Sequence, residues 1–149
     1  MKKFLALAGV SAVALIAPGT VGAATKSYSG TFESSGTVGF DVKKKKGKRK
    51  VIKFRFDDLP VECDAGPNTA SGNVPEFKIK VSDGGNFDAD LVSETPGAEA
   101  ELNIAGKLKS GGKAAGNLRL HGKDVIVDNT AGGETQPCDS DKTKWTAES

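Results

Sequence analysis

This sequence has few of the residues that usually build catalytic and metal sites. Its 149 residues include one histidine (His121), two cysteines, one tryptophan and one tyrosine. A single histidine excludes sites built from several imidazoles, and two cysteines do not fill the four-ligand shell of a structural zinc. The nucleophile-elbow pattern G-x-S-x-G is absent, and no glycine-rich phosphate loop opens a helix. The composition therefore indicates no particular reaction, cofactor or metal.

Long apolar runs are also lacking, apart from one at the N-terminus. Residues 4–17 are apolar behind Lys2 and Lys3, and small residues at 21–23 suit a signal peptidase. The run is too short and wrongly flanked for a membrane span, so residues 1–23 are predicted to be a secretory signal peptide. We expect residues 24–149 to form one domain that is secreted or associated with the cell envelope, as a soluble monomer.

The two cysteines, Cys63 and Cys138, are predicted to form a disulfide. An even pair in an exported chain favours a bridge over two free thiols, because the extracellular compartment is oxidising. The bridge would close a long loop. In the chain-entropy model such a loop contributes about 4 kcal/mol to stability, less any native strain.

Helix signals are nearly absent after residue 23, whereas period-two alternation between glycine-containing breaks is plentiful. The pattern predicts an all-β fold, an antiparallel meander of about ten strands. Both a β-sandwich and a small β-barrel fit it. Residues 64–75 and 129–137 are predicted to be loops, residues 61–63 and 125–127 short strands, and the segment around Trp145 the closing strand.

Hairpin registers follow if apolar residues on both sides of a turn share one face. Three-residue loops are predicted at 34–36, 45–47, 83–85 and 110–112, each with a final glycine at positive φ. The predicted cross-strand pairs are Phe32–Val38, Gly30–Phe40, Tyr28–Val42, Phe40–Ile52, Val38–Phe54, Val81–Phe87, Ile79–Ala89, Phe77–Leu91, Leu108–Ala114, Gly106–Gly116, Ile104–Leu118 and Leu102–Leu120. Gly106 and Gly116 would leave a hollow on the inner face, which Trp145 is expected to fill.

Charge is balanced in sum but unevenly distributed. Residues 24–149 hold nineteen basic and nineteen acidic side chains, yet residues 41–56 carry nine basic residues and only one acid, Asp41. This is not the globally basic composition of a nucleic-acid-binding domain. The candidate contact residues for an acidic polymer or an acidic protein surface are Lys43, Lys44, Lys45, Lys46, Lys48, Arg49, Lys50, Lys53 and Arg55. The competing interpretation is a solvated hairpin that prevents aggregation, with Lys43, Arg49, Lys53 and Arg55 outward.

Several structural motifs are spaced as in a known group of proteins. They are Tyr28-x-Gly30, the lone Cys63 after Phe54-x-Phe56, the inner Phe87, Gly106-x-Leu108, Ala115-Gly116-x-Leu118-Arg119, and Cys138 followed by Trp145-x-Ala147. Over most of residues 24–149 the chain thus resembles a family of small exported bacterial disulfide-linked β proteins of unassigned function. The resemblance implies a sandwich or barrel with a disulfide holding the last strand, and no reaction. The dense lysine hairpin departs from the family pattern.

Candidate catalytic and metal-binding residues are few. His121 is predicted to face outward at the end of a strand, where a triad role is disfavoured. Asp88 and Asp90 share one strand face about 7 Å apart, which is a spacing compatible with glycoside hydrolysis but also with a solvated surface. Clustered oxygens at Asp83, Asp88 and Asp90, and at Asp139 and Asp141, do not match calcium-loop spacings.

The sequence therefore predicts a secreted, non-enzymatic β module that binds a partner or has a structural role in the envelope, with the basic hairpin as its contact site. The alternative is an extracellular hydrolase whose site the sequence does not reveal. A pocket containing His121 or converging carboxylates would favour the enzyme. A filled core with flat polar faces would favour the module.

The predicted disulfide can be tested by alkylation. Because both cysteines are expected to be oxidised, alkylation of the denatured protein without reductant should label neither Cys63 nor Cys138, as mass spectrometry would show. After reduction both should be labelled. Two labelled thiols in the unreduced sample would contradict the bridge.

Overall fold

The computed structural model describes residues 22–92, 99–127 and 135–149, without the side chains of residues 75–77. The predicted signal peptide falls largely outside the described residues. The described elements are β1 (Ala24–Phe32), β2 (Thr37–Lys45), β3 (Lys48–Cys63), β4 (Gly66–Val81), β5 (Asn86–Val92), β6 (Ala100–Leu108), the short 3-10 turn η1 (Ser110–Gly112), β7 (Lys113–Ile126), β8 (Thr135–Asp139) and β9 (Thr143–Glu148). The all-β prediction is confirmed. The described residues include no helix with the length and hydrophobicity that a membrane crossing requires.

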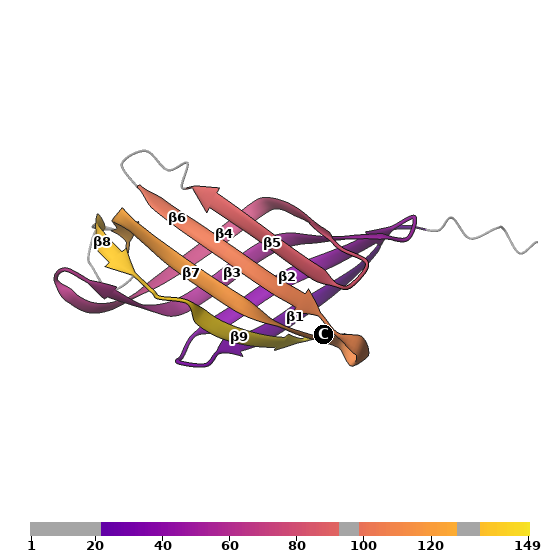
Figure 1. Ribbon diagram of the computed structural model, residues 1–149, viewed down its shortest axis with the longest axis horizontal. Helices are drawn as coiled ribbons and strands as arrows, with labels where there is room; N and C mark the ends of the chain where they lie inside the picture. The colour runs from indigo at the N-terminus through magenta and orange to yellow at the C-terminus, as the bar shows by residue number, and fades with distance from the viewer. Residues whose placement is uncertain (1–21, 93–98, 128–134) are drawn as a thin grey trace, which may run out of the picture.

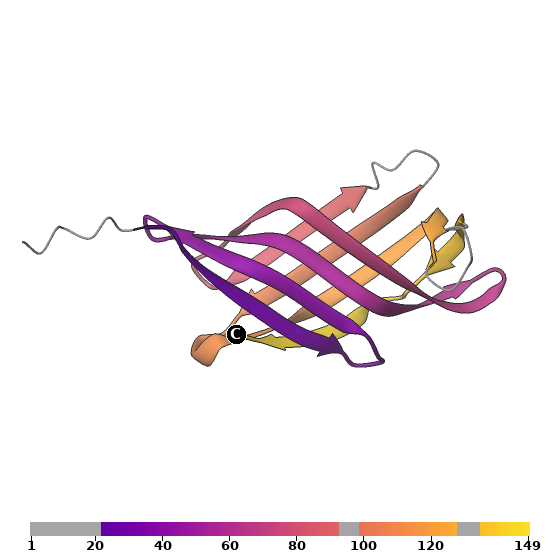
Figure 2. The ribbon, with the colours of Figure 1, turned by 180° about the vertical axis from the view of Figure 1, so that it is seen from behind.

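The nine strands form one antiparallel sheet in the order β4-β3-β2-β1-β9-β7-β6-β5. It is mostly a meander, since β1–β4 and β5–β7 are each joined by consecutive hairpins. The sheet curls so that β1–β4 lie behind β5, β6, β7 and β9 (Figures 1 and 2). Off the main path, β8 pairs with both β3 and β7, which joins the two layers at one end.

The core lies between the layers and is rich in aromatic rings. Phe40 is fully buried and stacks between Tyr28 and Phe54, with ring centroids 5.0 and 6.0 Å apart. Trp145 meets Phe40 edge-on at 5.6 Å and lies against Gly106 and Gly116, as predicted. Its buried Nε1 has no hydrogen-bond partner among the described residues.

The hairpin of β6 and β7 has the predicted register throughout. Leu108 pairs with Ala114, Gly106 with Gly116 and Ile104 with Leu118. The predicted positive φ is also confirmed at all four loop glycines. These are Gly36 (φ 85°), Gly47 (77°), Gly85 (86°) and Gly112 (72°). Alternation and glycine placement were therefore sufficient for this hairpin.

The register predicted for β1 and β2 was wrong by two residues. Gly30 pairs with Val38 and Tyr28 with Phe40, so the predicted pair Phe32–Val38 does not form. Phe32 instead closes a wider loop, in which its N–H donates to the carbonyl of Gly36, and it pairs with Trp145 of β9. Because the error is an even number of residues, each side chain keeps its predicted face.

The lysine hairpin of β2 and β3 also differs from its prediction, here by one residue. Lys45 pairs with Lys48, leaving a two-residue turn in which Lys46 (φ 51°) and Gly47 are both left-handed. That backbone geometry suits the twist of a two-residue hairpin. The predicted pair Phe40–Ile52 is therefore absent, and Val51 is buried where Ile52 was expected.

Two irregularities in β3 return its apolar residues to the core. Lys53 (φ 53°) and Asp58 (φ 54°) lie where the pairing with β4 shifts register. Each extra residue moves the following side chains to the other face. Phe54 and Phe56 are buried after the first shift, and Leu59 after the second. The inward prediction for Phe54 and Phe56 is thus confirmed, although the predicted register was wrong.

Residues 64–75, predicted to be a loop, lie almost entirely in β4, and residues 61–63 form the end of β3. Proline and polar residues misled the prediction. β4 is an edge strand, and edge strands tolerate proline because one backbone side needs no partner. Likewise, part of the predicted loop at 129–137 forms β8, and residues 128–134 lie outside the described residues. Residues 125 and 126 end the long strand β7.

The hairpin predicted for β4 and β5 forms only at its turn. Ser82 N–H donates to the carbonyl of Asn86, but the described strand pairs include none between β4 and β5. Val81–Phe87, Ile79–Ala89 and Phe77–Leu91 are therefore not paired, and the Phe77 side chain lies outside the described residues. β4 and β5 are the two edge strands of the sheet. This is because β9 pairs with β1 and β7 and so joins the two halves, which leaves β4 and β5 at opposite ends of the strand order.

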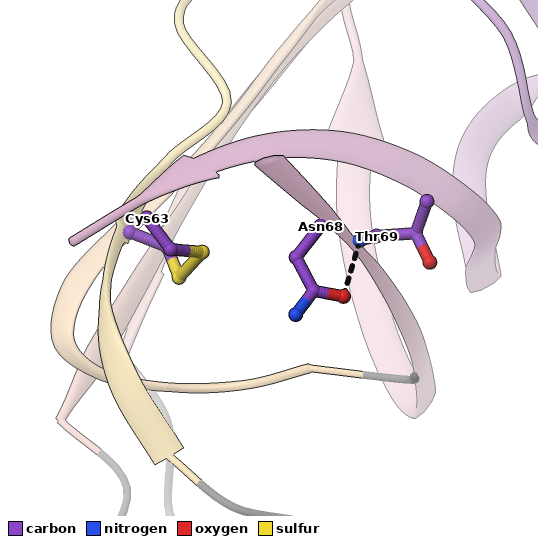
Figure 3. The surroundings of a disulfide bond; sticks show 4 residues. Cys63, Asn68 and Thr69 are labelled. Atoms are coloured by element: carbon purple, nitrogen blue, oxygen red, sulfur yellow. Dashed lines mark hydrogen bonds between the residues drawn. A yellow bond between two sulfur atoms is a disulfide. The ribbon is translucent and has the colours of Figure 1, made fainter. Parts of the chain in front are cut away.

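Cys63 and Cys138 form the predicted disulfide. It joins the end of β3 to β8, at residues that also pair directly in the sheet. Figure 3 shows Cys63 beside the first residues of β4, where the Asn68 side-chain oxygen accepts the Thr69 N–H at 2.8 Å. The bridge thus fixes the end of the sheet where β8 connects the layers.

The close approach of Trp145 to Gly116 can be tested by substitution. A Cβ at Gly116 would overlap the carbonyl oxygen of Ala105 and the Trp145 ring. Gly116→Ala should therefore lower the free energy of unfolding by about 1–3 kcal/mol or more, as overpacking does. Gly84→Ala is the matched control, since its nearest atom would be 3.4 Å away. Equal stability of both variants in denaturant titrations would contradict this packing.

Candidate polyanion-binding surface

The outer side of β2, β3 and β4 presents a set of exposed lysines that we call the basic face. It consists of Lys43, Lys45, Lys48, Lys50, Lys78 and Lys80. Lys43 is directly opposite Lys50, and Lys50 is directly opposite Lys80. Like charges directly opposite each other destabilise a sheet, so this three-lysine row has a cost in folding.

The nine basic residues predicted as contacts do not all share this face. Lys43, Lys45, Lys48 and Lys50 belong to it, and Lys46 lies in the adjoining turn. The predicted outward position of Arg49 was wrong. Arg49 pairs with Lys44 on the side to which Val51 points, because the two-residue turn shifts the register by one residue.

The last two predicted contacts lie farther from the turn. Lys53 is exposed, as predicted, and its ammonium is 3.9 Å from the Asp41 carboxylate. Arg55 is also exposed, and its guanidinium lies across Gly39 of β2. Neither side chain continues the row of opposed lysines.

Sequence reasoning missed Lys78 and Lys80. They lie on β4 opposite Ile52 and Lys50, and alternate with the partly buried Ile79. The local signal was present, since Lys-Ile-Lys-Val is an alternating strand pattern. What was missing was the pairing of β4 with the lysine hairpin, which only the tertiary structure supplies.

More lysines gather at the same end of the molecule. The β2–β3 turn, the β4–β5 turn and η1 lie at one end, and the β3–β4 turn lies at the other (Figures 1 and 2). Arg49 donates to the carbonyl of Ser82 at 3.4 Å, and Leu108 N–H donates to that of Gly85 at 2.9 Å. The basic residues added at this end are Lys26, Lys107, Lys109 and Lys113.

Acidic side chains gather at the opposite end. Those near the β3–β4 turn and β8 are Glu62, Asp64, Glu99, Glu101, Asp124, Asp139 and Asp141. Some are paired there, as Glu99 is with Lys123 at 3.6 Å. The fold therefore converts a locally uneven sequence into a molecule with one basic and one acidic end.

A hollow of about 610 Å³ opens at the acidic end and contains the only histidine. Its polar lining is Glu99, Glu101, His121, Lys123 and Asp139. The His121 side chain is 29% exposed; its Nε2 donates to the Asn103 side-chain oxygen at 3.1 Å and lies 3.6 Å from Glu101. Asn103 in turn donates to Asp90 at 2.8 Å. These contacts hold the imidazole in a polar row across β5, β6 and β7.

The described residues offer no activated nucleophile beside His121. Ser140 directly follows Asp139, the residue that pairs with His121, and is buried. Its hydroxyl accepts the Leu120 N–H at 2.9 Å and donates to the carbonyl of Asp141 at 2.9 Å. A hydroxyl committed to two backbone groups does not form the nucleophile–base hydrogen bond of a triad.

Asp139 is held by its neighbours in the ionised state. The Arg119 guanidinium donates two hydrogen bonds to its carboxylate, and the Asp141 N–H donates a third at 2.8 Å. Hydrogen bonding from Arg119 is the main cause that lowers the pKa of Asp139 below its ordinary value of 3.8, against a smaller effect of burial. The same pair raises the pKa of Arg119. Asp139 is therefore a poor general acid.

The remaining carboxylates singled out from the sequence are spread over the surface. Asp88 and Asp90 are exposed on β5, as predicted, and Asp83 lies in the turn before it. Asp139 is bonded to Arg119. Within the described ranges, no three histidine, cysteine or acidic residues are grouped so as to hold a metal ion.

Comparison with known proteins identified no relative of this chain. No protein-family model matches this chain, and searches among curated proteins and solved structures found no significant match. The resemblance to small exported β proteins stays a prediction from the sequence motifs.

The Arg119–Asp139 pair predicts a pH dependence of stability. Because the folded-state pKa of Asp139 is lowered, its contribution is present above pH 3.8 and is lost as the pH falls through and below that value. Arg119→Gln should therefore destabilise the protein slightly at neutral pH and less well below pH 3.8. The coupling between the two side chains is measured by denaturant titrations of four proteins. These are the native protein, Arg119→Gln, Asp139→Asn and the double variant. A coupling that persists at low pH would exclude the ion pair as its source.

Proposed function

We propose that this protein is an exported, non-enzymatic binding module whose basic face contacts an anionic polymer. Support comes first from the placement of the lysines. Lysine on an edge strand is a common protection against edge-to-edge aggregation, and β4 is such an edge. Strands β2 and β3 are interior strands, with neighbours on both sides. Edge protection therefore accounts for Lys78 and Lys80 but not for Lys43 and Lys50.

The single observation that carries the proposal is the row of opposed lysines on interior strands. Lys43, Lys50 and Lys80 repel one another in the free protein. Solubility alone does not require this, because the same charges spaced among acids would serve without the repulsion. A bound polyanion would remove it, so the arrangement is unfavourable only in the absence of a partner.

The chemistry of the face indicates recognition by charge. A lysine ammonium is a compact point charge without the bidentate geometry of arginine. Every aromatic side chain that the structure describes is buried, so the basic face offers no ring on which bases could stack. A polymer recognised by its charges alone therefore fits this surface better than single-stranded nucleic acid, whose bases would find no ring to stack on. The predicted signal peptide and the disulfide support a place of action outside the cytoplasm.

A hydrolase acting outside the cell is the second candidate, and the hollow around His121 is the observation in its favour. The hollow brings His121 together with Glu101 and Asp139. Against it, Asp139 is bonded to Arg119, and the Ser140 hydroxyl is occupied by backbone groups. Two of the candidate groups near His121, the Asp139 carboxylate and the Ser140 hydroxyl, are thus already bonded within the protein, and we favour the binding module.

Polyanion binding should depend steeply on salt. A partner contacting about six lysines would lose on the order of 10³-fold in affinity between 50 and 200 mM salt, by analogy with nucleic acids. The measurement is elution of the folded protein from an anionic matrix across a salt series. A variant in which the basic residues of 43–50 become glutamine should elute at much lower salt.

In the control variant, glutamine replaces Lys123, Lys142 and Lys144, which lie away from the basic end. It should elute at nearly the same salt concentration as the native protein. If the hairpin variant is retained as strongly as the native protein, the lysines serve solubility alone.

A further inference from the structure

The surroundings of the opposed lysines give the proposed polymer a direction. Starting from the turn, the first outer row is Lys45–Lys48 and the second is Lys43–Lys50–Lys80. The third row contains Asp41, Ile52 and Lys78, in that order across the strands. An acid and a partly buried apolar residue thus end the continuous positive surface along β2 and β3.

Across the strands the second row places three lysines in succession, whereas along β2 or β3 only two follow one another before Asp41 or Ile52. Neighbouring strands lie about 4.8 Å apart, so the three lysines of the second row are spaced over about 10 Å. Along a strand, outward residues are about 6.6 Å apart. On β2, Lys45 and Lys43 are followed by Asp41, which already has Lys53 as its partner. An anionic chain that followed β2 away from the turn would therefore meet this acid directly after Lys43.

Resting on the proposed function, we infer that the partner is a linear polymer with a negative charge on nearly every repeat, lying across β2, β3 and β4 along Lys43, Lys50 and Lys80. A chain with sparse charges would leave one or two of these lysines unneutralised and keep their mutual repulsion. Flexible lysine stems adjust to the exact spacing, and point charges do not distinguish carboxylate from phosphate. The density and continuity of charge, rather than the kind of anion, select the partner.

Two polysaccharides provide the test of charge density. Polygalacturonate carries a carboxylate on every sugar, and hyaluronan carries one on alternate sugars. At equal salt and equal chain length, the native protein should bind polygalacturonate at least tenfold more tightly than hyaluronan, measured by titration calorimetry. Inorganic polyphosphate should bind at least as tightly as polygalacturonate, and monomeric phosphate should bind far more weakly because it neutralises one lysine at a time. Equal affinity for the two polysaccharides would overturn the inference.

Two triple variants test the position of the chain. The row variant is Lys43→Gln with Lys50→Gln and Lys80→Gln. Its matched control is Lys107→Gln with Lys109→Gln and Lys113→Gln, which removes the same charge from exposed lysines at the same end of the molecule but off the basic face. The row variant should lose at least tenfold in affinity for polygalacturonate, and the control less than threefold.

Folding and binding should respond in opposite directions to the row variant. Removing opposed like charges should leave its melting temperature equal to or above that of the native protein, so weaker binding would not reflect unfolding. Equal losses in both triple variants would overturn the row while leaving polymer binding through net charge intact. Native protein that binds none of the polymers at low salt would instead refute the proposed function itself.

Discussion

The structure depends on keeping one side of β3 against the core over its sixteen residues, from the basic turn to the disulfide. Strict alternation would not achieve this in the present sequence, since Val51 and Phe54 lie an odd number of residues apart and both are buried. The left-handed residues Lys53 and Asp58 each add a position to the strand and reset its faces. Because β3 pairs with β2, β4 and β8, these shifts also set which side chains of its neighbours point outward.

Charge separation follows from the same strand. β3 begins opposite Lys45, at the basic end, and finishes at Cys63, next to Glu62 and Asp64. Hairpins joined in sequence return to the same two ends, so the lysines on either side of η1 and the acids at and after the end of β8 join groups that are already charged. Residues 24–149, which hold nineteen basic and nineteen acidic side chains, thus concentrate opposite charges at two ends, where local fields can be large although the sum is zero.

The two ends differ in how their charges are satisfied. At the acidic end, Arg119, Lys123 and His121 lie beside carboxylates, and the polar groups around the hollow have partners within the protein. On the basic face, Lys43, Lys50 and Lys80 face other lysines instead. Where like charges face one another, binding a partner of opposite charge gives a larger gain in free energy than where the charges are already paired. This contrast favours the basic face over the hollow.

The sequence by itself determined the fold class, the disulfide, the aromatic core and the left-handed glycines. These depend on local alternation, on turn chemistry and on cysteine count, which are properties of short segments. It also determined that residues 41–56 would be strongly basic. The register of β6 with β7 belongs here too, because a short turn leaves a single arrangement that buries Leu108, Ile104 and Leu118 together.

Only the tertiary structure decided which lysines act together. Arg49 and Ile52 changed faces because the two-residue turn differs from the predicted three-residue loop by one residue, and an error of one residue inverts a strand. The edge position of β4, with its prolines, and the short strand β8 depend on pairing between segments distant in sequence. Lys80 joined the row for the same reason, since cross-strand neighbours are set by long-range backbone hydrogen bonds that no local pattern encodes.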